Sequence, residues 1–152
     1  MQKIIKLAAT LSIISLLFSP LALAQLGKGG RGSGGWGRNS QYQRLYNLNT
    51  VTTITGKVIA VDNQVSMRGM STGVHVKVST ANGNILVHLG PAWYLGNQDV
   101  QIELGDQIEV TGSQVTLAGV PVIIAAKIRK GDQILTLRDQ NGFPVWSGWR
   151  KQ

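Results

Sequence analysis

The sequence predicts an all-β domain in which five or six strands close into a small Greek-key barrel, with one short helical insertion between the third and fourth strands. Two observations predict this fold class. From Val51 onward, apolar and polar residues alternate in short runs rich in β-branched side chains, and turn residues separate these runs. One segment, residues 92–103, interrupts the alternation directly after Gly90-Pro91, where proline suits a first helical position.

The strands are predicted from their residues and from the turns between them. Val51–Val61 is rich in β-branched residues, and Gly56 in its middle suits a long strand that bends or bulges. Gly73–Thr80 and Ile85–Leu89 flank Asn82-Gly83, and Asn-Gly between alternating runs is a strong hairpin signal. After the helical segment, the predicted strands are Gln107–Gly112, Val120–Ile128 and Gln133–Arg138.

The first 24 residues have the features of a secretory signal peptide. A basic start precedes an apolar run over residues 7–23, and Ala22-Leu23-Ala24 presents the small residues that a signal peptidase requires. We therefore expect cleavage near Ala24-Gln25 and a periplasmic or secreted mature protein without stable membrane insertion. A membrane anchor is the alternative, but Pro20 and the small residues at the end of the run argue against it.

A glycine-rich, basic segment separates the predicted signal peptide from the barrel. Residues 25–44 contain seven glycines and four basic residues, with no acid and no periodic apolar pattern. Such a composition buries too little surface to offset its backbone entropy. We therefore predict a flexible tail whose deletion leaves stability nearly unchanged, followed by a barrel domain with an aromatic C-terminal extension over residues 45–152.

Composition and motifs limit the function classes. The chain has no cysteine, which excludes disulfides, thiolate metal sites and a cysteine nucleophile. The formal net charge is +8, but seven basic residues balance seven acidic ones between residues 45 and 149, so the excess lies at the ends. We find no catalytic triad, nucleophile elbow, zinc-protease helix or phosphate loop, and we predict a protein that is not an enzyme and uses no cofactor.

The predicted order of elements is that of an OB-fold, which is a small Greek-key barrel. In wording, residues 51–149 resemble a group of small exported bacterial OB-fold proteins, most of them uncharacterised. The phrases that carry the resemblance are TGKVIAVD, GVHVKVST, VHLGPAWYL, GDQIEVTGS, IIAAKIRKGDQILTLRD and NGFPVWSGW. The resemblance implies an OB-fold-like barrel, supports this fold more firmly than any activity, and supplies no catalytic residues.

The predicted hairpin places the only two histidines on one face of the sheet. If Asn82-Gly83 forms the two-residue loop, Lys77 pairs with His88, and His75 becomes a diagonal neighbour of His88. His75, Lys77 and His88 then face outward, opposite the valines that face the core. We predict that this face and the adjoining loops bind a protein partner or a small ligand, and ordinary solvated or aromatic-packed histidines are the alternative.

A copper site, or a site for another metal, is a second possible use of this face. Met67 and Met70 lie just before the strand that carries His75, and thioether and imidazole ligands suit copper together with His88. Lys77 lies between the histidines and would repel a cation. We therefore expect weak copper binding at best.

Aromatic and basic residues suggest a third possibility, which is the binding of nucleic acid or another polyanion without sequence preference. Trp93 and Tyr94 follow the third strand and could stack on bases, whereas in the alternative Trp93 plugs one end of the barrel. Lys127 and Arg129 alternate with apolar residues, so we predict them on the outward face of their strand. A solvated strand face is the alternative for these two cations.

Overall fold

The computed structural model describes residues 34–147. This part of the chain contains six strands, one short α-helix and two 3-10 turns. The 3-10 turns are η1 (Gln43–Leu45) and η2 (Leu48–Thr50), and the helix α2 (Ala92–Leu95) lies between the third and fourth strands. The strands are β1 (Val51–Gln64), β2 (Gly73–Thr80), β3 (Gly83–Pro91), β4 (Gln107–Leu117), β5 (Val120–Lys130) and β6 (Gln133–Thr136).

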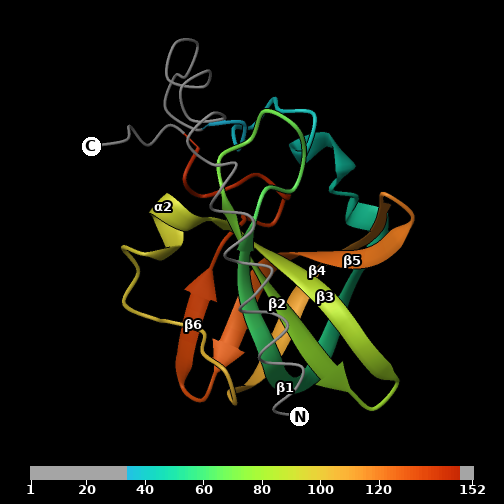
Figure 1. Cartoon of the computed structure of the whole chain (residues 1–152), viewed down its shortest axis with the longest axis vertical. Coiled ribbons are helices and arrows are strands. Elements are labelled where there is room, and N and C mark those ends of the chain that lie inside the picture. The colour runs from blue at the N-terminus through green and yellow to red at the C-terminus, as the bar shows by residue number, and fades with distance from the viewer. Residues whose placement is uncertain (1–33, 148–152) are drawn as a thin grey trace.

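The sheet closes on itself as a barrel (Figure 1). Its strand order is β3-β2-β1-β4-β5-β6, and an additional parallel pairing of β3 with β5 joins five strands into a ring. All other strand pairs are antiparallel. This ring is the Greek-key order of an OB-fold. The predicted all-β, OB-fold-like barrel with a short helix between strands three and four is therefore confirmed.

Alternate residues of the strands fill the barrel. Val58, Val76, Val87, Val110 and Ile128 come from five different strands, and each is fully buried. Such inward-facing aliphatic side chains supply most of the hydrophobic stabilisation of a barrel that has no disulfide. No helix in the described residues is long and apolar enough to cross a membrane.

Ring closure brings backbones close together at two glycines. A Cβ on Gly56 would collide with the carbonyl oxygen of Ser79, and one on Gly112 with the carbonyl oxygen of Ile124. Gly112 also lies where the β4–β5 register shifts, while β1 shifts register two residues beyond Gly56, between Val58 and Ala60. Glycine thus permits close backbone approach at both sites, and the predicted irregularity of the first strand lies beside Gly56.

Residues 34–46 pack onto the barrel beside β2 and β3, and we call them the strap. Trp36 is 1% exposed and Tyr42 is 2% exposed, and both belong to the hydrophobic core. The prediction of a flexible tail is therefore wrong for residues 34–44, because their aromatic side chains bury enough surface to offset the entropy of the glycines. The predicted signal peptide and residues 25–33 lie outside the described residues.

Candidate functional site

The two histidines lie directly opposite each other on β2 and β3. His75 pairs with His88, and their rings stack with centroids 3.8 Å apart and planes within 4° of parallel. The predicted pairing of Lys77 with His88 is wrong, because Lys77 pairs with Leu86. The turn uses Ala81-Asn82, and Gly83, with φ of 115°, already belongs to β3.

The strap and loop 65–72 together cover the two histidines. His75 is 3% exposed and His88 is 2% exposed, so the prediction that they lie on an open outward face is wrong. Tyr42 of the strap stacks over His88, and its hydroxyl forms a 3.0 Å hydrogen bond with Nδ1 of that ring. On the other side, Oγ of Ser66 lies 2.9 Å from Nε2 of His75. Of the three residues predicted for this face, Lys77 alone is exposed.

Burial keeps both imidazoles neutral at physiological pH. Desolvation lowers the pKa of His75 to about 4, although the nearby carboxylate of Asp62 acts in the opposite direction. The pKa of His88 is lowered to about 3, chiefly by desolvation and in addition by Arg138 and by a proton on His75. Burial also raises the pKa of Tyr42 to about 12, so its hydroxyl keeps its proton.

Arg138 is a buried cation beside this cluster, and the sequence patterns do not predict it. The residue is 3% exposed, and its guanidinium donates to the carbonyl oxygen of Ala125 and, from Nε, to Gln43 of the strap. The same group lies 5.2 Å from the ring of Trp146 and 5.8 Å from that of Tyr46, where cation–π attraction contributes. No carboxylate in residues 34–147 forms an ion pair with it.

Hydrogen bonds tie the strap to two distant segments. The indole nitrogen of Trp36 donates to the carbonyl oxygen of Ser71 over 3.1 Å, and that of Trp146 donates to the carbonyl oxygen of Trp36 over 2.8 Å. Gln43 donates to the carbonyl oxygen of Gly142. The strap therefore joins loop 65–72 to the C-terminal segment across the histidine pair.

The arrangement does not direct both imidazoles at one metal ion. Stacked, parallel imidazoles direct their lone pairs along separate planes, so the two rings cannot aim at one ion. One nitrogen of each ring is already hydrogen-bonded, and within residues 34–147 no three His, Cys, Asp or Glu side chains are grouped to hold a metal. Met70 is buried, whereas Met67 packs at the edge of the core.

The aromatic pair after β3 belongs largely to the core. Tyr94 is buried, and its ring packs against Trp146 with centroids 5.2 Å apart. Trp93 is half-buried against the same core and meets Tyr94 edge-on at 6.4 Å. Tyr94 is therefore not open for stacking on a base, and Trp93 shows one partly exposed side.

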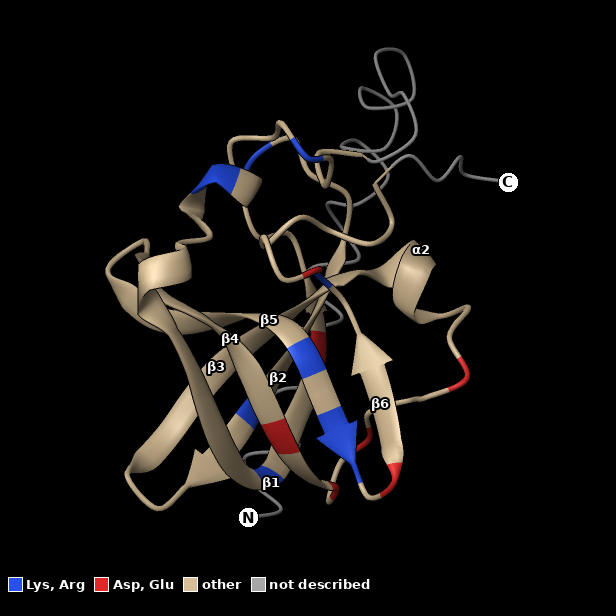
Figure 2. Cartoon of the chain, turned by 180° about the vertical axis from the view of Figure 1, so that it is seen from behind, with Lys and Arg blue, Asp and Glu red and all other residues tan. Residues whose placement is uncertain are grey.

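Lys127 and Arg129 lie on the outward side of the barrel, as the alternation of β5 predicts. We call the outward side of β1, β4, β5 and β6 the bare face (Figure 2). Lys127 pairs across the sheet with Thr111, and Arg129 forms a 3.7 Å ion pair with Glu109. The cations of this face are thus partly balanced by an acid.

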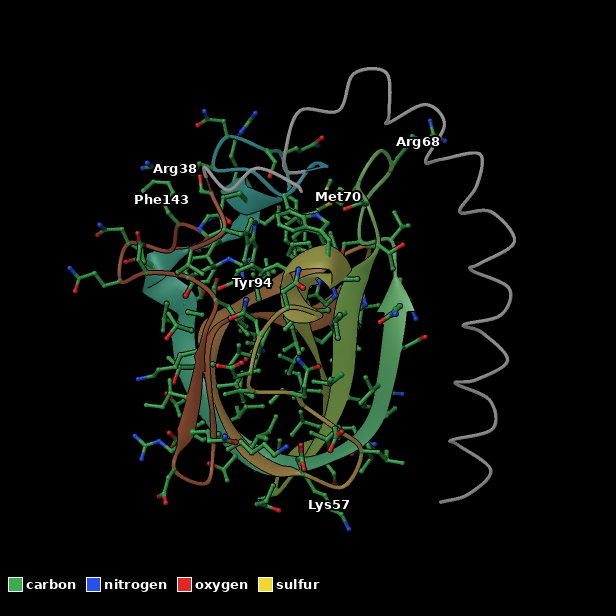
Figure 3. All side chains as sticks on the ribbon, turned by 90° about the vertical axis from the view of Figure 1, so that its left-hand side faces the viewer. Arg38, Lys57, Arg68, Met70, Tyr94 and Phe143 are labelled. Carbon is green, nitrogen blue, oxygen red and sulfur yellow. The ribbon has the colours of Figure 1, made fainter. Side chains whose placement is uncertain are left out.

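Three further arginines are exposed at the end of the barrel that carries the strap and loop 65–72. Figure 3 shows Arg38 and Arg68 at this end, opposite Lys57. The guanidinium of Arg38 lies 4.0 Å from the ring centroid of Phe143, and Arg44 of the strap donates to the carbonyl oxygen of Asn39. Neither these two nor Arg68 forms an ion pair with any acid in the described part of the chain.

Comparison with known proteins supplies a family. The chain is similar to the N-terminal domain of the PriB protein from Thermoanaerobacter tencongensis, with 15% sequence identity, a TM-score of 0.38, and coverage of 56% of this chain and 99% of that one. The barrel assignment rests on strand order and closure and not on this likeness. No curated protein sequence matches the chain. The MamS/MamX magnetosome protein family matches residues 50–135, which hold β1 to β5 and most of β6, and the chain therefore belongs to this family.

Proposed function

We propose that this protein is an exported, non-enzymatic accessory protein that binds an anionic partner through the arginine end, which we define by Arg38, Arg44 and Arg68. The observation that carries the proposal is that these three arginines are exposed, whereas no described acid neutralises any of them. Exposed guanidinium groups bind phosphate and carboxylate oxygens through directed, charge-assisted hydrogen bonds.

The acids at this end are already engaged by their own loops. Oδ1 of Asp139 accepts hydrogen bonds from the backbone nitrogens of Asn141 and Phe143. Asp62 accepts from the backbone of Asn63 and the side chain of Gln64. These donors are neutral and leave both carboxylates charged, but the three guanidinium groups outnumber the two acids, and the balance favours the approach of anions.

The sequence on both sides of the described residues is basic. Lys28 and Arg31 precede the described residues, and Arg150 and Lys151 follow them. These cations add to the positive charge of the chain, which favours association with anionic partners.

Export remains part of the proposal. The basic start, the apolar run and Ala22-Leu23-Ala24 support it, and so does the resemblance to small exported OB-fold proteins. The expected mature chain begins at Gln25. Intact mass of protein recovered from a periplasmic extract tests this, and a membrane-bound species that retains residues 1–24 would contradict it.

Binding is tested with the mature chain and a labelled heparin oligosaccharide, in parallel with a single-stranded oligonucleotide and anionic phospholipid vesicles. We expect the triple variant Arg38→Gln, Arg44→Gln, Arg68→Gln to weaken binding by at least ~tenfold at low salt and to reduce its salt dependence. The matched control, Lys57→Gln, Lys77→Gln, Lys127→Gln, removes the same charge from the sides and the opposite end. An equal loss in both variants, or no binding of any probe by the mature chain, would refute the proposal.

A further inference from the structure

The two stacked histidines are the only histidines of the chain, and Tyr42 of the strap packs over His88. Tyr42 belongs to an aromatic cluster with Trp36 and Trp146, and both histidines are buried beside it. Burial in this environment favours the neutral form of both imidazole rings. A proton on either ring would create a buried cation 3.8 Å from the other ring.

The groups around the pair offer little compensation for such a charge. From the strap, the neutral hydroxyl of Tyr42 contacts His88, and from loop 65–72 the hydroxyl of Ser66 contacts His75. From the C-terminal segment, the charge of Arg138 acts against a proton on His88. On β1, Asp62 pairs with His75 and is the acid that favours a proton there.

We propose that His75 and His88 form an acid-sensitive latch: protonation of the stacked pair releases the strap and uncovers the outward face of β2 and β3. The proposal is independent of what the arginine end binds. Release lets water reach both rings, which removes the desolvation cost of the charge. The barrel can remain closed, because its strands are held by their own ladder of backbone hydrogen bonds and the strap contributes no strand to the ring.

The direction of the pH effect follows from the two states. In the closed state the pKa values are about 4 and about 3, and in the open state the rings return toward 6.5. Closure is therefore fully stable above pH 6.5 and is lost progressively as the pH falls toward 4. With two protons taken up, the open fraction increases by up to about a hundredfold per pH unit in this window.

Hydrogen–deuterium exchange of the mature chain tests the latch, with rates corrected for the intrinsic effect of pH. Between pH 7 and pH 4.5 we expect exchange in the strap to rise at least ~tenfold more than exchange in β4, which serves as the internal reference. Replacing the cluster by Tyr42→Phe, His75→Phe, His88→Phe keeps aromatic packing without a titrating ring. The strap of this variant should show no such rise.

If strap and β4 exchange rise together, or if the three-phenylalanine variant opens like the wild type, the latch is refuted. Should that variant not fold, NMR titration of the two wild-type imidazoles decides: ordinary values near 6.5 with the strap closed would overturn the proposal.

Discussion

The strapped face, which is the outward side of β2 and β3 around His75 and His88, and the bare face have the same strand geometry but opposite environments. His75 and Lys127 both occupy outward positions of alternating strands. Lys127 is exposed to solvent, whereas His75 is buried against His88 and Ser66 of loop 65–72. The alternation of side chains along a strand therefore predicts which side of the sheet a residue lies on, but not whether another segment covers that side.

The difference arises from contacts between residues far apart in the sequence. Tyr42 and His88 are 46 positions apart, and Trp36 and Trp146 are 110 positions apart. On the bare face, in contrast, outward residues contact neighbours that the sheet register itself supplies, such as Thr53 and Thr111. Local sequence patterns predict the cross-strand contacts of the bare face but not the contacts of the strap with distant residues.

The largest expected effect is the difference in stability between a substitution in the strap and one on the bare face. Trp36→Ala removes a buried indole that packs against Tyr42 and Trp146, so we expect a loss of about 3–5 kcal/mol in the free energy of unfolding. Lys127→Ala on the bare face should change it by no more than about 0.5 kcal/mol. Urea denaturation measures both values. A cost for Trp36→Ala as small as that for Lys127→Ala would show that the strap adds nothing to the fold.

The barrel could be predicted from the sequence because its signals are local. The hairpin turn, the alternating runs and the helical interruption after Gly90-Pro91 all gave elements that the structure contains. The end of β4 was missed: it runs past Gly112 to Leu117 and turns at Ala118-Gly119, both with positive φ. Glycine at 112 suggested a strand end, but its role is to permit close approach to β5.

The candidate site was predicted only in part, because its cover is not local. The pattern correctly placed His75 and His88 on one face but predicted the wrong cross-strand partner for His88. A loop of Ala81-Asn82 and a loop of Asn82-Gly83 put the same residues on the same faces, so alternation alone does not distinguish them. The available signal for the strap was the presence of Trp36 and Tyr42 within the glycine-rich segment. Nothing in the pattern around Arg138 indicates that a cation is buried without an acidic partner.

The second prediction uses pH to distinguish the faces. Between pH 7 and pH 5 the unfolded chain takes up protons on both histidines, with pKa near 6.5, while the folded chain with its strap closed does not. The contribution of the two neutral histidines to the free energy of unfolding is therefore fully present above pH 6.5. It falls as the pH is lowered, and at pH 5 the loss is about 2–4 kcal/mol. Denaturation at the two pH values measures this loss.

The control for this loss is the variant Tyr42→Phe, His75→Phe, His88→Phe, which keeps every acid of the bare face. Its stability should change far less between pH 7 and pH 5. An equal loss in the variant would assign the effect to carboxylates and would contradict the role of the histidines.

The smallest expected effect lies on the bare face, at the ion pair between Arg129 and Glu109. Both side chains are largely exposed and their charged atoms are 3.7 Å apart, so water and salt screen their attraction. Glu109→Gln should therefore lower the free energy of unfolding by less than about 1 kcal/mol, and this difference should shrink further in 0.5 M salt, at roughly a 4 Å screening length. Urea denaturation at low and high salt measures it, with Thr55→Ser, the register neighbour of Glu109, as a neutral control. A salt-resistant loss of several kcal/mol would mean that the bare face, like the strapped face, is covered by a part of the chain or by a second copy in solution.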